Sequence, residues 1–129
     1  MTVVVGDAEE LRACYVAALD AVEQASGRTV DALDEARQAR EVARDLVLGG
    51  RRLVDLEHEM PLQPLRASVA DALAALERAR HDAQRLLFQL LHAEGMTLAE
   101  IGRSYGISRQ LVSRLVNEPE PDRHPDRTA

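Results

Sequence analysis

The spacing of apolar residues predicts that most of this chain is α-helical. The clearest case is the stretch 61–96, where apolar residues recur at alternating spacings of four and three. The row comprises Leu65, Val69, Ala72, Leu76, Ala79, Ala83, Leu86 and Leu90. A 3.5-residue repeat is typical of a helix that packs lengthwise against other helices. We therefore predict one long helix that starts near Pro61 and Pro64 and ends at Gly95.

Two weaker apolar stripes precede this helix. They predict helices over about 8–26 and 30–48, with Ser26-Gly27 as the break between them. Gly49-Gly50 should break or kink the chain again, and a helical pattern resumes over 51–60. The first part of the chain is therefore expected to be a bundle of about three helices.

The stretch 97–117, TLAEIGRSYGISRQLVSRLVN, predicts two short helices joined by a tight turn. Thr97 followed three residues later by Glu100 forms a capping box, which marks the start of the first helix. Gly106 can adopt the positive φ that ends a helix and turns the chain. Ser108 is a second N-cap directly after that turn.

The second short helix has one apolar face and one polar face. Leu111, Val112 and Leu115 form the apolar face. The opposite face carries Arg109, Gln110, Ser113, Arg114 and Asn117. Arginine suits guanine, glutamine and asparagine suit adenine, and serine suits either a base or a phosphate. The polar face therefore has the chemistry of a DNA-contacting surface.

This stretch resembles the helix-turn-helix family of phage repressors, bacterial repressors and the last region of sigma factors. Ile101 matches the first buried position, Gly102 the obligatory small one, and Gly106 the turn glycine, with Ile107 buried after it. The resemblance implies DNA binding, with the second helix in the major groove and the first helix of a three-helix unit at about 82–94. The family's DNA-facing positions correspond to Ser108, Arg109, Gln110, Ser113, Arg114 and Asn117.

We assign two roles to the candidate site residues. Base edges or nearby phosphates are expected to be contacted by Arg109, Gln110, Ser113 and Arg114. The unit is expected to be positioned on the DNA backbone by Thr97, Arg103, Ser108 and Asn117. Arg78, Arg80 and Arg85 would add phosphate contacts if they lie on the same side.

The last residues, 119–129, contain three prolines and alternating charges, and we predict that they are disordered. They offer no β-hairpin, so the unit should lack a wing. The expected fold is all-α: a helical bundle over 1–81 for dimerisation or partner binding, whose long helix leads into a wingless three-helix unit over 82–118.

Net charge qualifies the DNA-binding prediction. The chain carries −6 overall, and residues 1–60 alone hold 13 acidic residues and 7 arginines, a net of −6. Residues 97–118 hold three arginines and two glutamates, a net of +1. Because phosphate contacts supply most non-specific affinity, a monomer should bind duplex DNA poorly. We therefore expect a homodimer.

Composition argues against several other classes of protein. Aromatic residues make up 2% of the chain, which argues against a cage for a planar ligand. The single cysteine, Cys14, excludes an internal disulfide, and its place on an apolar helix face predicts a buried thiol. No apolar run of 18 residues or basic signal region occurs, so we expect a cytoplasmic protein that neither spans nor binds a membrane.

We expect neither catalysis nor a cofactor or metal. Glu57-His58-Glu59 lacks the second histidine of a zinc helix, and Glu77 with His81 gives two ligands without a third. The main hypothesis is therefore a transcription regulator that binds specific sequences in double-stranded DNA as a homodimer. Two alternatives to it stay open. The helix-turn-helix can serve as a protein–protein module, contacting a sigma-factor partner or an assembly, or the bundle can bind an effector that controls DNA binding.

Overall fold

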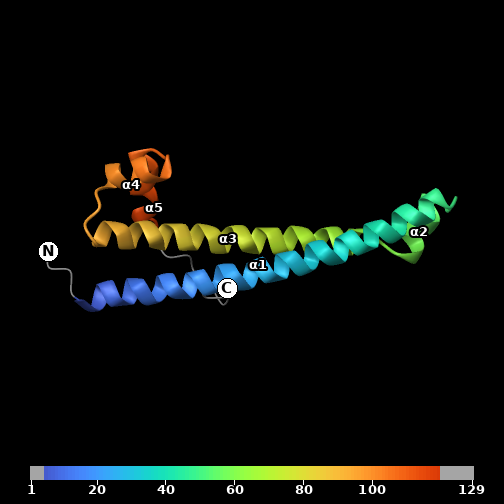
Figure 1. The fold of residues 1–129 in the computed structure, drawn as a ribbon, viewed down its shortest axis with the longest axis horizontal. Helices are drawn as coiled ribbons and strands as arrows, with labels where there is room; N and C mark the ends of the chain where they lie inside the picture. The colour runs from blue at the N-terminus through green and yellow to red at the C-terminus, as the bar shows by residue number, and fades with distance from the viewer. Residues whose placement is uncertain (1–4, 120–129) are drawn as a thin grey trace, which may run out of the picture. The chain divides into compact units, whose positions relative to one another are not determined.

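The computed structural model describes residues 5–119, and all regular structure in this range is helical (Figure 1). The helices are α1 (Val5–Leu48), α2 (Leu53–Glu59), α3 (Gln63–Ala93), α4 (Leu98–Tyr105) and α5 (Arg109–Val116). The all-α prediction is thereby confirmed. Apart from its first residue, the tail predicted to be disordered lies outside the described residues. Within residues 5–119, no helix is both long and apolar enough to cross a bilayer.

The chain folds as two compact units, and α1 and α3 contribute to both. Residues 16–83 form the first unit, which we call the helical hairpin. The second unit contains the described residues 5–15 and 84–119, and we call it the helix-turn-helix unit. The predicted division into 1–81, 82–118 and 119–129 stays a prediction.

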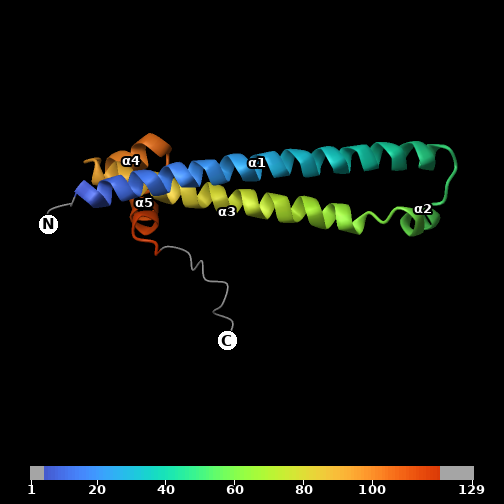
Figure 2. The same cartoon turned by 90° about the horizontal axis from the view of Figure 1, so that it is seen from below.

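In the helical hairpin, α1 and α3 run antiparallel and side by side (Figures 1 and 2). The buried residues of α1 in this unit are small: Ala18, Ala25, Thr29, Ala32 and Ala36. The Thr29 hydroxyl lies 2.8 Å from the carbonyl oxygen of Ala25 and 3.3 Å from that of Ala72 on α3. These residues follow one another at spacings of seven, four, three and four, so they form a seam of small side chains along the helix pair.

The chain reverses after α1 at Gly49-Gly50, as predicted. The amide of Arg51 donates to the carbonyl of Leu46, and the amide of Gly50 donates to that of Val47, both at 3.0 Å. Gly50 has φ of 95°, and this pair of bonds satisfies carbonyl groups that the helix end leaves unpaired. The helical pattern predicted after the glycines is α2, which buries Leu56.

The predicted break at Ser26-Gly27 is wrong, because α1 continues through it. Gly27 is exposed, while Ala25 and Thr29 on either side of it are buried in the seam. Packing against α3 on both sides therefore outweighs the cost of about 1 kcal/mol that a glycine imposes on a helix.

Cys14 is exposed, which corrects the predicted buried thiol. Its neighbours Leu11, Tyr15 and Ala18 are the residues of this part of α1 that are half-buried or buried. They advance by four and then three, so they follow one helical face, and Cys14 lies beside that face rather than on it.

The helix-turn-helix unit is built around four buried residues: Phe88 of α3, Ile101 of α4, and Val112 and Leu115 of α5. Partly buried apolar residues complete this core: Leu87, Leu91, Met96, Leu98, Ile107, Leu111 and Val116. The end of the long helix α3 thus serves as one of the three helices that enclose this core, as predicted from the sequence. Arg12 on α1 and Glu94 form an exposed ion pair at 3.2 Å within the same unit.

Candidate nucleic-acid interface

The first short helix, α4, starts at the predicted capping box. The Thr97 hydroxyl accepts the amide hydrogen of Glu100 at 3.1 Å, and the Glu100 carboxylate accepts that of Thr97 at 3.3 Å. Both residues are exposed. Because a hydroxyl that accepts one hydrogen bond still carries its own proton, Thr97 keeps a donor for a phosphate oxygen.

Two glycines fix the angle between α4 and α5. Gly106 has φ 68° and ψ 31°, the left-handed conformation, and its amide donates to the carbonyl of Gly102. A Cβ atom on Gly102 would lie 2.8 Å from the backbone carbonyl oxygen of Ile107, which no side chain movement relieves. The requirement for a small residue at this position is thus a close contact between helix and turn.

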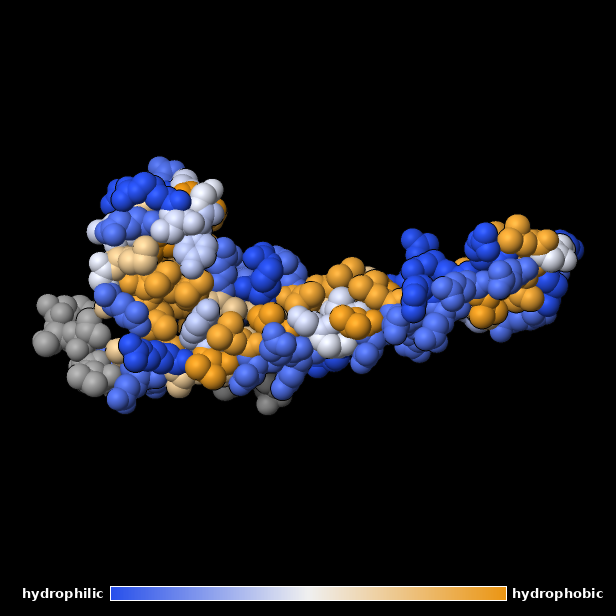
Figure 3. Space-filling model, viewed as in Figure 1, coloured by the Kyte–Doolittle hydropathy of each residue, from blue (hydrophilic) through white to orange (hydrophobic). Residues whose placement is uncertain are grey.

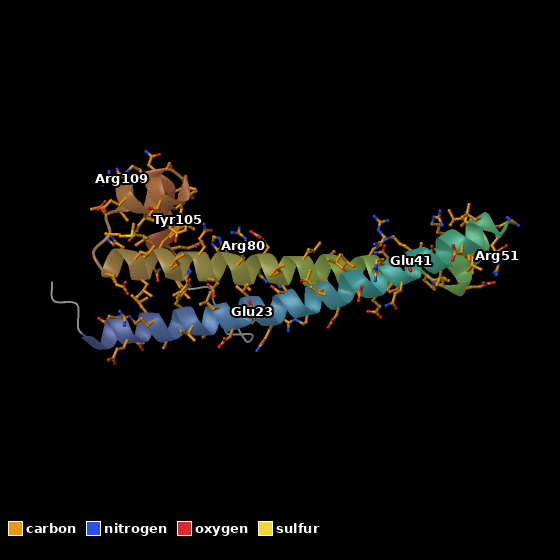
Figure 4. All side chains as sticks on the ribbon, in the orientation of Figure 1. Glu23, Glu41, Arg51, Arg80, Tyr105 and Arg109 are labelled. Atoms are coloured by element: carbon orange, nitrogen blue, oxygen red, sulfur yellow. The ribbon has the colours of Figure 1, made fainter. Side chains whose placement is uncertain are left out.

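The second short helix, α5, presents the predicted polar face. The Ser108 hydroxyl accepts the amide hydrogen of Leu111 at 3.1 Å and so caps the helix. Val112 and Leu115 are buried against the core. The side chains on the other face are exposed or, for Ser113, half-buried: Arg109, Gln110, Ser113, Arg114 and Asn117. Figure 4 shows Arg109 at the side of this unit away from α3.

A shallow depression of about 240 Å³ joins the first turns of the two short helices. Its lining consists of Leu98 from α4 with Arg109, Gln110 and Ser113 from α5. Three of the predicted base-contacting residues therefore lie together, and Arg114 is not among them. Leu98 is not among the predicted site residues, and nothing in the local sequence shows that its side chain borders the polar face.

The remaining predicted site residues lie outside this depression. Arg103 is exposed in the last turn of α4. Asn117 ends α5, and its amide nitrogen donates to the Ser113 carbonyl at 2.8 Å. Thr97 and Ser108 precede the two helices as caps. Thr97 and Ser108 lie at helix N-termini, where backbone and hydroxyl donors are accessible to phosphate oxygens. Arg103 and Asn117 lie at C-terminal ends, where only their side chains can donate to a phosphate.

Two contacts hold the short helices on α3, and the sequence did not reveal either. The Gln89 side chain donates to the carbonyl of Val116 at 3.0 Å, which ties the last turn of α5 to α3. The rings of Phe88 and Tyr105 meet edge to face, with centroids 5.1 Å apart and an interplanar angle of 63°. Both contacts join residues far apart in the chain, so no local pattern signals them.

The three arginines upstream of the two short helices differ in exposure and in hydrogen bonding. Arg85 is only 3% exposed, so the expectation that it contacts phosphate is wrong. Arg80 donates to both carboxylate oxygens of Glu77, at 2.6 and 3.0 Å. These hydrogen bonds hold the pKa of Glu77 below its usual value. Arg78 is exposed.

Within residues 5–119, no three or more histidine, cysteine, aspartate or glutamate side chains are grouped so that they could hold a metal ion. Of the Glu77 and His81 pair, the Glu77 carboxylate accepts a hydrogen bond from Arg80.

The two capped helices, the left-handed glycine and the buried face of α5 define a helix-turn-helix. Residues 81–118 match the family model described as Sigma-70, region 4. This segment is a helix-turn-helix DNA-binding region, which confirms the resemblance to the last region of sigma factors. The matched segment covers α4, α5 and the end of α3, and less than half of the chain. Neither the curated proteins nor the solved structures gave a match.

Proposed function

We propose that the chain regulates transcription as a homodimer that binds specific sequences in duplex DNA, with α5 in the major groove. The observation that carries this proposal is the division of α5 into two faces. Val112 and Leu115 anchor one face in the core, and the other face exposes two arginines and two amides. A capped helix held this way presents its polar face as a rigid surface.

Sequence discrimination is assigned to the first turns of α5. Arg109, Gln110 and Ser113 share one depression, so their side chains are close enough to contact neighbouring base pairs. In helix-turn-helix proteins the N-terminal residues of the second helix contact base edges. Arg114, one turn further along, is placed for a base or a nearby phosphate.

Positioning on the backbone is assigned to Thr97, Arg103, Ser108 and Asn117. Thr97 and Ser108 keep a hydroxyl proton while they cap their helices. Arg103 supplies a charge at the end of α4. These contacts fix orientation and carry no sequence information.

The dimer is proposed because one unit carries little positive charge. Residues 97–118 have a net charge of +1, so one copy offers few contacts to phosphate. Two copies double those contacts and contact half-sites about one helical turn of DNA apart. We further propose that the protein acts in the cytoplasm and performs no catalysis.

The second candidate is a protein-binding role for the same helix-turn-helix. The charge distribution favours it, because residues 1–60 carry a net of −6. The arginines and amides of α5 favour DNA instead, since they match both base edges and phosphates. The salt dependence of binding separates the two roles.

The test measures fluorescence anisotropy of the full chain with genomic duplex fragments at about 50 and 200 mM salt. We expect affinity to fall steeply with salt, because bound arginines displace counterions from phosphates. On a selected site, Arg109→Ala and Arg114→Ala should each cost about 1–3 kcal/mol of binding.

Arg28→Ala is the matched control, since Arg28 is an exposed arginine of the helical hairpin. It should leave specific affinity unchanged, and all three variants should keep the wild-type melting temperature. A folded chain that binds no duplex at low salt would refute the proposal and favour the protein-binding role.

A further inference from the structure

Several of the larger aliphatic side chains of the helical hairpin are exposed. Its seam buries alanines, whereas Val30, Leu33 and Leu73 are 62%, 44% and 48% exposed. Figure 3 shows apolar side chains gathered over the α1–α3 pair. Scattered apolar residues on a surface are ordinary, but contiguous apolar patches mark interaction sites.

A row of residues on α1 runs parallel to the seam, and all of them except the half-buried Ser26 are exposed. Each follows a seam residue by one position: Leu19, Ser26, Val30, Leu33 and Arg37. The residues that precede the seam residues form the other flank: Ala17, Gln24, Arg28, Asp31 and Glu35. Only the first flank is rich in large aliphatic residues. Because its residues also follow one another at spacings of seven, four, three and four, a second helix can pack along it.

A groove of about 400 Å³ lies between α1 and α3 beside this row. Leu62, Leu65, Val69 and Leu73 form most of its apolar lining. Arg40 and Arg66 also line it, so the groove combines an apolar interior with positive charge. It therefore fits an apolar side chain that has an acidic residue close by in its helix.

The same chain supplies such a segment. Leu19 is 42% exposed, and the acidic residues Asp20 and Glu23 follow it on α1 (Figure 4 labels Glu23). Glu23 precedes Val30 by seven residues, and Arg37 follows Val30 by seven. If two α1 helices cross antiparallel at Val30, each Arg37 faces the partner's Glu23, and the groove faces the partner's Leu19.

We infer that a second copy of this chain docks on the exposed flank, with the two α1 helices antiparallel and centred on Val30. The arrangement is isologous, as a twofold dimer requires, because both charges and both apolar partners come from one surface. Arg37 contacts Asp34 at 3.1 Å within its own helix, and such an exposed pair is weak enough to be shared. The inference rests on the proposed dimeric function and names its pairing surface.

The test is a charge swap followed by sedimentation equilibrium of the full chain without DNA. Arg37→Glu and Glu23→Arg should each weaken dimerisation about tenfold or more, because each dimer then contains two like-charge contacts. An equimolar mixture of the two variants should recover the wild-type dissociation constant. In that mixed dimer, both contacts join a glutamate to an arginine.

Arg28→Glu on the polar flank is the matched control and should leave the dissociation constant unchanged. Circular dichroism should show the same helix content in every variant. A monomer at all concentrations, or variants whose mixture does not recover dimerisation, would overturn the inference. A dimer that behaves as expected but binds no duplex would refute the proposed function and leave the pairing surface intact.

Discussion

The two units of this protein differ in the size of the side chains that they bury. The helix-turn-helix unit surrounds three fully buried large residues, Phe88, Ile101 and Val112. The helical hairpin buries alanines and one threonine along α1, and its buried leucine is Leu56 of α2. A fully buried large aliphatic or aromatic side chain contributes about 1.5–3 kcal/mol, and alanine far less. The helix-turn-helix unit is therefore closed by its own residues, whereas the helical hairpin keeps surface for a partner.

The largest expected effect comes from removing the centre of the closed core. Phe88→Ala should cost about 3–5 kcal/mol of folding free energy, because it leaves a cavity and removes the ring contact with Tyr105. Urea denaturation measures the loss. Hydrogen exchange should show faster exchange in α4 and α5 than in residues 16–48.

The distribution of exchange rates shows whether the two units unfold separately. Uniform acceleration of exchange over both units would show that they unfold as one cooperative block. In that case, the difference between their cores would have no consequence for local stability.

A smaller effect is expected from enlarging the seam. Ala25 is 2% exposed, so Ala25→Leu should destabilise the hairpin by about 1–3 kcal/mol through overpacking. Exposed Ala21 on the same helix provides the control, and Ala21→Leu should be nearly neutral. Thermal melts compare the two. A stabilising Ala25→Leu would mean that the seam has unfilled space beside Ala25.

The smallest effect concerns a single backbone conformation. Gly106→Ala should cost about 1–2 kcal/mol, since an L side chain disfavours the left-handed region that this residue occupies. The cost falls on the turn between α4 and α5, so DNA affinity should fall with it. Calorimetry and anisotropy on the same sample provide the readout. An unchanged melting temperature would show that the turn relaxes at little cost.

Local signals in the sequence predicted the parts of the fold that depend on neighbouring residues. The Thr97 capping box, the Gly106 turn and the end of the long helix at Gly95 each involve residues within one or two turns. The break at Ser26-Gly27 failed because its outcome depends on α3. Seam contacts made by Ala25 and Thr29 keep the helix continuous, and no feature of α1 alone predicts them.

In the candidate interface, too, local features were predictable from the sequence and contacts between helices were not. The polar face of α5 follows from helical periodicity, and the structure places its residues as expected. The burial of Arg85, the tether from Gln89 and the position of Leu98 beside Arg109 depend on how three helices meet. Periodicity assigns a residue to a face of its own helix and does not specify what that face meets.

The paired glycines after α1 have a consequence for the order of folding. The turn joins Leu46 to Arg51 by a hydrogen bond, whereas the Arg12–Glu94 pair joins positions 82 residues apart. Closing a long loop costs more chain entropy than closing a short one. We expect the hairpin to form first at Gly49-Gly50 and to extend outward, each added turn shortening the loop that still has to close. The contact between the start of α1 and Glu94 would then be among the last to form, after α4 and α5 have already paired locally.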